Sequence, residues 1–345
     1  MSGVAQALLA ALLFGASTPA SKWLLASATP LQLAGLLYLG AALGTVLAFA
    51  RERRSGALRA MGRRNAPRLL GAIVLGGVAG PVFMLVGLRA SLAGSVSLLL
   101  NLELAATAAL GVLWFREPLG PKGWLGVVGV VMAGALVSGD AGWPGLVAAC
   151  WVAAACLCWG IDNHLTARID GITPASSTFW KGAIAGTTNL ALGLALAPFA
   201  GSAATAAGGL AVGALCYGAS VALYIASAQQ LGATRSQALF AVAPFAGAAL
   251  SWGVLGEPIA VAQLVGAVLL IAAVAAIVRS QHEHDHVHGE VEHVHAHRHD
   301  DDHHTHEHPG LAPEAQHSHW HRHEPLAHAH PHWPDLHHRH VHRSS

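Results

Sequence analysis

A glutamate and an asparagine lie near the middle of an apolar stretch that is long enough to cross a membrane. The stretch 95–117 reads SVSLLLNLELAATAALGVLWFRE, and Glu103 is at the midpoint if the span extends over 91–115. A carboxylate at that depth costs about 3 kcal/mol on insertion scales, so such residues usually face inward and are functional. Glu103 is therefore a candidate substrate or proton site, with Asn101 as a less certain partner. The alternative is a protonated glutamate that only ties two helices together.

Small polar residues surround a proline in the first apolar stretch. Its sequence from 15 to 22 is GASTPASK, in which Ser17, Thr18 and Pro19 are consecutive. Pro19 removes one helical hydrogen bond, and the hydroxyl groups beside it can satisfy freed backbone groups. Because interrupted helices mark binding sites in transporters, these residues are either a substrate site or a structural kink. Lys22 is expected to reach the membrane interface, with a charge pair to Glu103 as the alternative.

A second polar group lies near the expected cytoplasmic end of the sixth apolar stretch. Asp162, Asn163 and His164 follow the sequence CLCWGI there. Cys158 and Asp162 share a helical face because they are four residues apart, whereas Asp162 and His164 do not. Since no firm set of metal ligands results, we expect Asp162 and Asn163 to form a polar gate.

Histidines alternate with other residues along the C-terminal segment. Residues 281–345 contain 23 of the 24 histidines, together with 4 Arg and 11 Asp and Glu. This polarity excludes a packed core and predicts a disordered tail. Alternate residues of an extended chain face one side, so His-x-His can converge on a Zn, Ni, Co or Cu ion. The alternative is a passive solvated tail. The candidate ligands are His282, His284, His286, His288, His293, His295, His297, His299, His317, His319, His321 and His323.

The rest of the chain has the composition of a membrane protein. Of all 345 residues 54% are hydrophobic and 11% are charged, and the mean hydropathy is +0.49. Apolar stretches of spanning length predict ten transmembrane helices. They cover 4–25, 30–50, 69–88, 91–115, 123–138, 145–166, 176–198, 205–228, 235–255 and 259–279. The first is expected to be a retained helix and not a cleaved signal peptide, because the first ten residues contain no Lys or Arg.

The placement of arginines predicts the orientation. The segment 51–68 holds seven Arg and one Glu, which places it in the cytoplasm by the positive-inside rule. The N-terminus is then cytoplasmic, and the even number of spans puts the tail there too. The sequence therefore predicts a multi-pass protein of the inner, or plasma, membrane. We expect contacts with the lipid bilayer and no nucleic-acid partner, and leave a homodimer open.

An internal repeat relates the two halves of the membrane part. FREPLGPKGWLGVVGVVMAGAL, at 115–136, matches LGEPIAVAQLVGAVLLIAAVAA, at 255–276, with an offset of 140. Each half, 1–138 and 145–279, has five expected spans, and an odd number gives the halves opposite orientation. Inverted repeats of this kind place the substrate site at the midplane between them. Pro244 has Leu104 at the matching position, so the halves have diverged where a cavity would lie.

Three segments carry a resemblance to a known family. LLFGASTPASK, SLLLNLELAATAALGVLWFREP and APFAGAALSWGVLGEP resemble the EamA branch of the drug/metabolite transporter superfamily, over about residues 4–279. The resemblance implies an all-α integral membrane protein in which two inverted five-helix repeats surround a central cavity. It also implies export or import of metabolites, but no particular substrate.

These observations leave three function hypotheses. The first is a secondary exporter of a divalent transition metal or its complex, coupled to protons through Glu103, with residues 280–345 buffering or sensing the ion. The second is export of an unrelated metabolite, with the tail as regulator or metal store. The third is a membrane protein that senses metal without transport. We expect no enzyme, because catalytic and nucleotide-binding motifs are missing, and no required cofactor.

Overall fold

The computed structural model describes residues 2–54, 65–115, 119–139, 142–166, 169, 173–231, 239–279, 285–288, 291–297, 317–323 and 326–329. The chain divides into two compact units, of which one contains Met1–Ser280 and the other is Gln281–His332.

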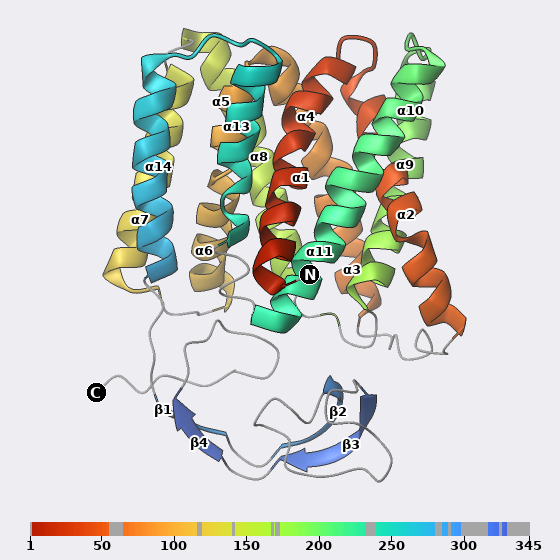
Figure 1. The fold of residues 1–345 in the computed structure, drawn as a ribbon, viewed down its shortest axis with the longest axis vertical. Helices are drawn as coiled ribbons and strands as arrows, with labels where there is room; N and C mark the ends of the chain where they lie inside the picture. The colour runs from red at the N-terminus through yellow and green to blue at the C-terminus, as the bar shows by residue number, and fades with distance from the viewer. Residues whose placement is uncertain are drawn as a thin grey trace. The chain divides into compact units, whose positions relative to one another are not determined.

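Long, roughly parallel or antiparallel helices build the first unit (Figure 1). In chain order they are α1 (Gly3–Leu24), α2 (Pro30–Arg54), α3 (Ala66–Ala72), η2 (Ile73–Ala79), α4 (Gly80–Ala90), α5 (Ala93–Leu99), α6 (Leu102–Phe115), α7 (Pro121–Gly139), α8 (Gly142–Thr166), α9 (Pro174–Leu196), α10 (Ala203–Val212), η3 (Gly213–Ala219), α11 (Ser220–Leu231), α13 (Ala243–Val254) and α14 (Val261–Arg279). Every predicted stretch contains helix.

Seven helices in the described ranges are long and apolar enough to cross a membrane, and Val261–Ile277 is a shorter apolar helix. A multi-pass helical membrane protein is therefore confirmed, whereas the number of ten spans stays a prediction.

Hydroxyl residues and prolines start several of these helices. The Ser2 hydroxyl accepts a hydrogen bond from the amide of Ala5 at the start of α1. Thr173 and Ser202 cap α9 and α10 in the same way, and Pro174 follows the first of these caps. Such residues satisfy amides that have no partner within the helix. The turn residues between the apolar stretches thus determine where the helices begin.

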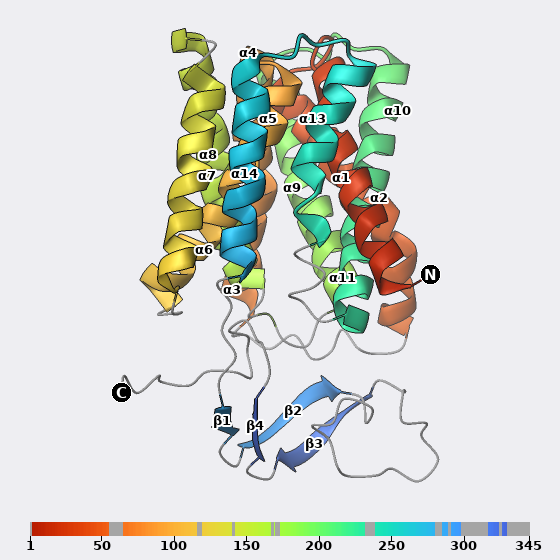
Figure 2. The ribbon, with the colours of Figure 1, turned by 60° about the vertical axis from the view of Figure 1, so that its left-hand side comes forward.

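The two halves repeat unusual backbone geometry at the predicted offset. The π-helices η2 (Ile73–Ala79) and η3 (Gly213–Ala219) are 140 residues apart. The helix breaks at 100–101 and 241–242 also lie about one repeat apart. Helix α2 packs on α9, and α7 packs on α14, so equivalent helices of the two halves meet. Figures 1 and 2 show α7 and α14 side by side. The internal repeat is thus present in the backbone itself.

A proline and two glycines account for the local structure of η2. Pro81 has no amide hydrogen, so the carbonyl of Gly77 lacks its α-helical partner. In addition, the amide of Gly80 donates to the carbonyl of Leu75 and not to that of Gly76. The Gly76 carbonyl is therefore available to other donors. Side chains from other helices bind both carbonyls, as described below. Single π-turns in helices are often found at functional sites.

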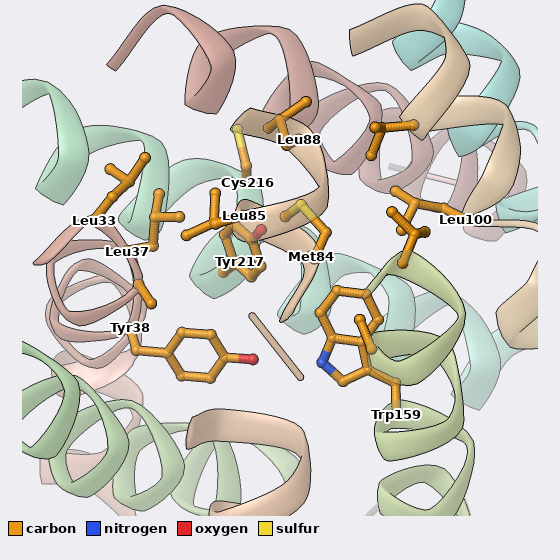
Figure 3. Packing of buried hydrophobic residues seen from close by; sticks show 14 of the residues in the cluster. Leu33, Leu37, Tyr38, Met84, Leu85, Leu88, Leu100, Trp159, Cys216 and Tyr217 are labelled. Atoms are coloured by element: carbon orange, nitrogen blue, oxygen red, sulfur yellow. The ribbon is translucent and has the colours of Figure 1, made fainter. Parts of the chain in front are cut away.

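An apolar core holds the helices around η2 and η3. It includes Leu33, Leu37, Met84, Leu85 and Leu88, together with Leu100 beside the break between α5 and α6. Figure 3 shows these side chains around the rings of Tyr38, Trp159 and Tyr217. The polar contacts described below therefore occur among well-packed side chains.

Strands occur in the tail, where the sequence analysis predicted disorder. Strand β1 (Asp285–His288) pairs antiparallel with β4 (Leu326–Ala329), and β2 (Val291–His297) pairs antiparallel with β3 (His317–His323). Disorder of the tail stays a prediction. The alternating pattern suits these strands, because a two-residue period matches an extended, paired chain.

Candidate functional site

The helix that carries Glu103 is broken directly before this residue. Helix α5 ends at Leu99 and α6 begins at Leu102, so Glu103 is in the first turn of α6. Across the break the amides of Glu103 and Leu104 donate to carbonyls three residues back, at 3.0 and 3.1 Å. The side chain of Asn101 donates to the carbonyl of Leu98 at 3.0 Å and is buried. Asparagine competes with the helical backbone in this way, so Asn101 shapes the break and is not bound to Glu103.

A carboxamide on α8 binds the Glu103 carboxylate. The Asn163 side chain donates to Glu103 Oε1 at 3.0 Å and to the Thr107 hydroxyl at 3.3 Å. One residue further, the His164 Nε2 lies 3.0 Å from the Thr107 carbonyl oxygen. Helices α6 and α8 are therefore joined by polar contacts around a carboxyl group. A neutral amide can donate a hydrogen bond to this carboxyl group whether the group is ionised or protonated.

A buried ion pair lies next to this group. The Lys181 ammonium donates to both oxygens of Asp162, at 2.7 and 2.6 Å. The Thr166 hydroxyl also donates to Asp162 Oδ1, at 3.0 Å. The carboxylate lies against Gly76 in η2, where any side chain would overlap it. Asp162 therefore has a cation as partner, whereas Glu103 has no ion pair to another described residue.

The carbonyls freed in η2 are bound from three helices. The Tyr38 hydroxyl and the Trp159 indole both donate to the Gly76 carbonyl, at 2.6 and 3.0 Å. Figure 3 shows their polar atoms pointing toward each other. The Asn189 side chain donates to the Gly77 carbonyl at 3.2 Å. Helices α2, α8 and α9 thus converge on the irregular turn beside Asp162.

Aromatic rings from both halves form a chain beside the acidic residues. The ring of Phe14 on α1 lies 5.7 Å from that of Tyr217 and 5.5 Å from that of Phe240. Tyr38 lies 5.8 Å from Tyr217, and Tyr224 lies 5.0 Å from Phe240. This chain of rings thus connects the two repeats.

The predicted polar site in α1 lies within an unbroken helix. Ser17, Thr18 and Pro19 are buried, and α1 is continuous from Gly3 to Leu24, so Pro19 does not interrupt it. The interruption lies instead in α5–α6 and before α13, where Pro244 is in the first turn. A proline in the first turn suits a helix start, because that position needs no amide donor.

Lys22 does not pair with Glu103. Its ammonium donates to the carbonyls of Leu88 and Ser91, at 2.8 and 2.6 Å. The alternative of a charge pair is therefore wrong. The last carbonyls of a helix lack internal partners and carry partial negative charge, so they attract a cation.

The predicted histidine ligands divide into two groups. His282, His284 and His299 lie outside the described residues. The others are in strands, where His293 lies opposite His321, His295 opposite His319, and His297 opposite His317. Within the described ranges no group of three or more His, Cys, Asp and Glu could hold a metal ion. Metal binding by the tail stays a prediction.

The partners of two charged side chains were not predicted from the sequence. Lys181 binds Asp162 on another helix. The Glu257 carboxylate accepts hydrogen bonds from the amides of Ala93 and Gly94 in the other half. The only available signal was the rarity of charge in apolar stretches.

Comparison with known protein families shows which family the sequence belongs to. Residues 1–139 and 146–279 each match the EamA-like transporter family. The chain belongs to this family. The family is one of transporters, and its two matches coincide with the two halves.

Two individual proteins are similar to this EamA-family chain. An "Uncharacterized transporter" of Methanothermobacter thermautotrophicus is 27% identical over 296 residues, which cover 77% of this chain and 82% of the relative. A protein with a crystal structure has a similar fold, with a TM-score of 0.55 and 15% identity, over 80% of this chain and 95% of that one. Both likenesses extend over most of each chain; the first agrees with a membrane transporter, and the second concerns the fold alone.

Proposed function

We propose that the protein is a proton-coupled secondary exporter of a small molecule, and that proton and substrate compete for Glu103. One observation carries this proposal. Glu103 is a carboxyl group at a break in a membrane helix, and its partner among the described residues is the neutral amide of Asn163. Carboxyl groups within membranes are usually functional, and broken helices form transporter sites near the midplane.

The coupling follows from charge balance. A proton or a positively charged group of the substrate can neutralise Glu103, but both cannot occupy it together. On the outer side a proton therefore displaces the substrate, and on the inner side the substrate displaces the proton. The nearby Asp162 suits this role less, because Lys181 already neutralises it.

Replacement of one carboxyl group tests the proposal. Glu103→Gln keeps the shape and a hydrogen bond but cannot ionise. The substrate would first be identified as the solute that accumulates in cells without the protein. In vesicles containing Glu103→Gln, we expect transport driven by a proton gradient to be lost, while exchange of substrate across the membrane persists.

Glu52→Gln is the matched control, because Glu52 accepts a hydrogen bond from the Ser176 hydroxyl at the end of α2 and an amide can still accept it. This control should transport like wild type. Gradient-driven transport at the wild-type rate by Glu103→Gln, at equal expression, would refute the coupling role.

A plasma-membrane location with both termini in the cytoplasm belongs to the same proposal. It rests on the seven arginines within 51–68. A reporter after Ser345 should be active only in the cytoplasm, and a tag at Gly142 should be accessible only from outside. The reverse pattern would exclude the proposed orientation.

The second candidate function is transport or sensing of a divalent transition metal. The observation in its favour is the register of β2 and β3. In this register three histidines at alternate positions of β2 lie opposite three histidines of β3. Directly opposite residues of an antiparallel pair are close neighbours. If the tail regulates, a chain that ends at residue 280 should transport without dependence on metal. If the tail conducts the metal, that chain should lose metal export and the cells should become sensitive to the metal.

A further inference from the structure

A cavity of about 290 Å³ lies at the end of the bundle where α1 and α4 end. Both halves of the chain contribute to its wall, through the ends of α1, α4 and α7 on one side and the starts of α8 and α14 on the other. Lys22, Arg89, Ser91, Ser95 and Gln263 are its polar lining residues. By the arginine distribution, this end of the bundle faces away from the cytoplasm.

Two cations of separate helices line this cavity. Positive charges are scarce on the predicted outer side, where Arg89 is the arginine of the connecting segments. Lys22 approaches from α1, and the carbonyls of Leu88 and Ser91 use two of its three ammonium hydrogens. Arg89 is in the last turn of α4. One ammonium hydrogen and a guanidinium group are thus available beside the same space.

Among the described residues, Glu257 is the carboxylate that acts on Lys22, but the two form no ion pair. Glu257 interacts electrostatically with Lys22, but its two oxygens accept hydrogen bonds from Ala93 and Gly94, at 2.7 and 2.8 Å. The Gln263 side chain donates to the Ser95 hydroxyl oxygen at 2.8 Å and accepts from the Ala260 amide at 3.0 Å. The polar groups of the wall are therefore held in place, and the described charges around the cavity sum to a positive value.

We propose that this cavity binds a small oxyanion, a carboxylate or a phosphate group, between Lys22 and Arg89. Guanidinium and ammonium groups are the usual partners of such anions, and serine hydroxyls can add hydrogen bonds. The volume is at the lower end of the range of ligand pockets, which suits a small group. Because the wall comes from both halves, the bound anion stabilises the arrangement in which they meet at this end. The site is separate from Glu103 and does not depend on the proposed transport function.

Thermal unfolding of the full chain with inorganic phosphate tests this site. The purified protein would be titrated in uncharged detergent at constant ionic strength, with chloride as the balancing ion. We expect a saturable rise of the unfolding midpoint for wild type. Arg89→Gln should weaken the apparent affinity at least tenfold, and Arg89→Lys should retain part of it. Arg89 is exposed, so its replacement should not prevent folding.

Lys122→Gln is the matched control, because this exposed lysine at the start of α7 is outside the lining of the cavity. It should respond to phosphate like wild type. Two results would overturn the proposal, namely no saturable rise for wild type or the same rise for Arg89→Gln.

The anion has two sources, a dissolved ion or a lipid headgroup. They are distinguished by repeating the titration in nanodiscs of phosphatidylcholine alone and of phosphatidylcholine with phosphatidylglycerol. A dissolved ion gives the same phosphate response in both. A lipid headgroup gives a higher midpoint with phosphatidylglycerol, no further rise with phosphate, and loss of that difference in Arg89→Gln.

Discussion

The ion pair between Asp162 and Lys181 offers a quantitative prediction. Its atoms are 2.6 Å apart, and the side chains are 9% and 17% exposed, respectively. At that distance an effective dielectric constant of about 20 gives a gross attraction of about 6 kcal/mol. Desolvation offsets much of this, and removal of one partner from a buried pair costs about 3–5 kcal/mol. We expect about 3 kcal/mol for Asp162→Asn or Lys181→Met, because the lysine is partly exposed.

The double replacement should cost much less than the sum of the two single ones. With both charges removed, no uncompensated charge is left between α8 and α9, so we expect a cost of about 3 kcal/mol and a coupling of about 3 kcal/mol. Equilibrium unfolding in detergent would measure all four proteins, with Lys122→Met as the control for the loss of an exposed lysine. Additive costs, with a coupling below about 0.5 kcal/mol, would refute a direct stabilising pair.

Three further changes have defined outcomes. Gly76→Ala should lower the unfolding midpoint strongly, because its Cβ would overlap the Asp162 carboxylate. Gly134→Ala should lower it only mildly, because its Cβ would meet only leucine methyl groups at 3.3 Å or more. Equal effects of the two substitutions would contradict this. Glu257→Gln leaves one of two amides at the start of α5 without an acceptor, so unfolding measurements should show a loss of about 1–2 kcal/mol; an unchanged protein would contradict the capping role. Zinc binding by the full chain should weaken when the pH is lowered below about 6, because protons then compete for imidazoles with a reference pKa of about 6.5. A chain ending at residue 280 should show no such binding, and calorimetry measures both.

The sequence by itself determined the class of fold. Membrane helices form their hydrogen bonds internally, so apolar stretches alone predict where they lie. Duplication leaves a linear signal, and the offset of 140 read from the Glu-Pro segments reappears in η2 and η3. Glu103 was recognisable because charge is rare and costly at the centre of a span. Its partner Asn163 was recognised only as polar, because the residues are 60 positions apart.

Tertiary structure alone decided how the charges are paired. Lys181 reaches Asp162, Glu257 reaches the start of α5, and Lys22 reaches the end of α4, each across a distance in sequence that no local pattern reports. The broken helix of the first half was also unforeseen, since it has no proline where the second half has Pro244. Helix breaks and π-turns depend on whether neighbouring side chains can bind the freed carbonyls, as Tyr38 and Trp159 do at Gly76. Such partners come together only when the helices pack.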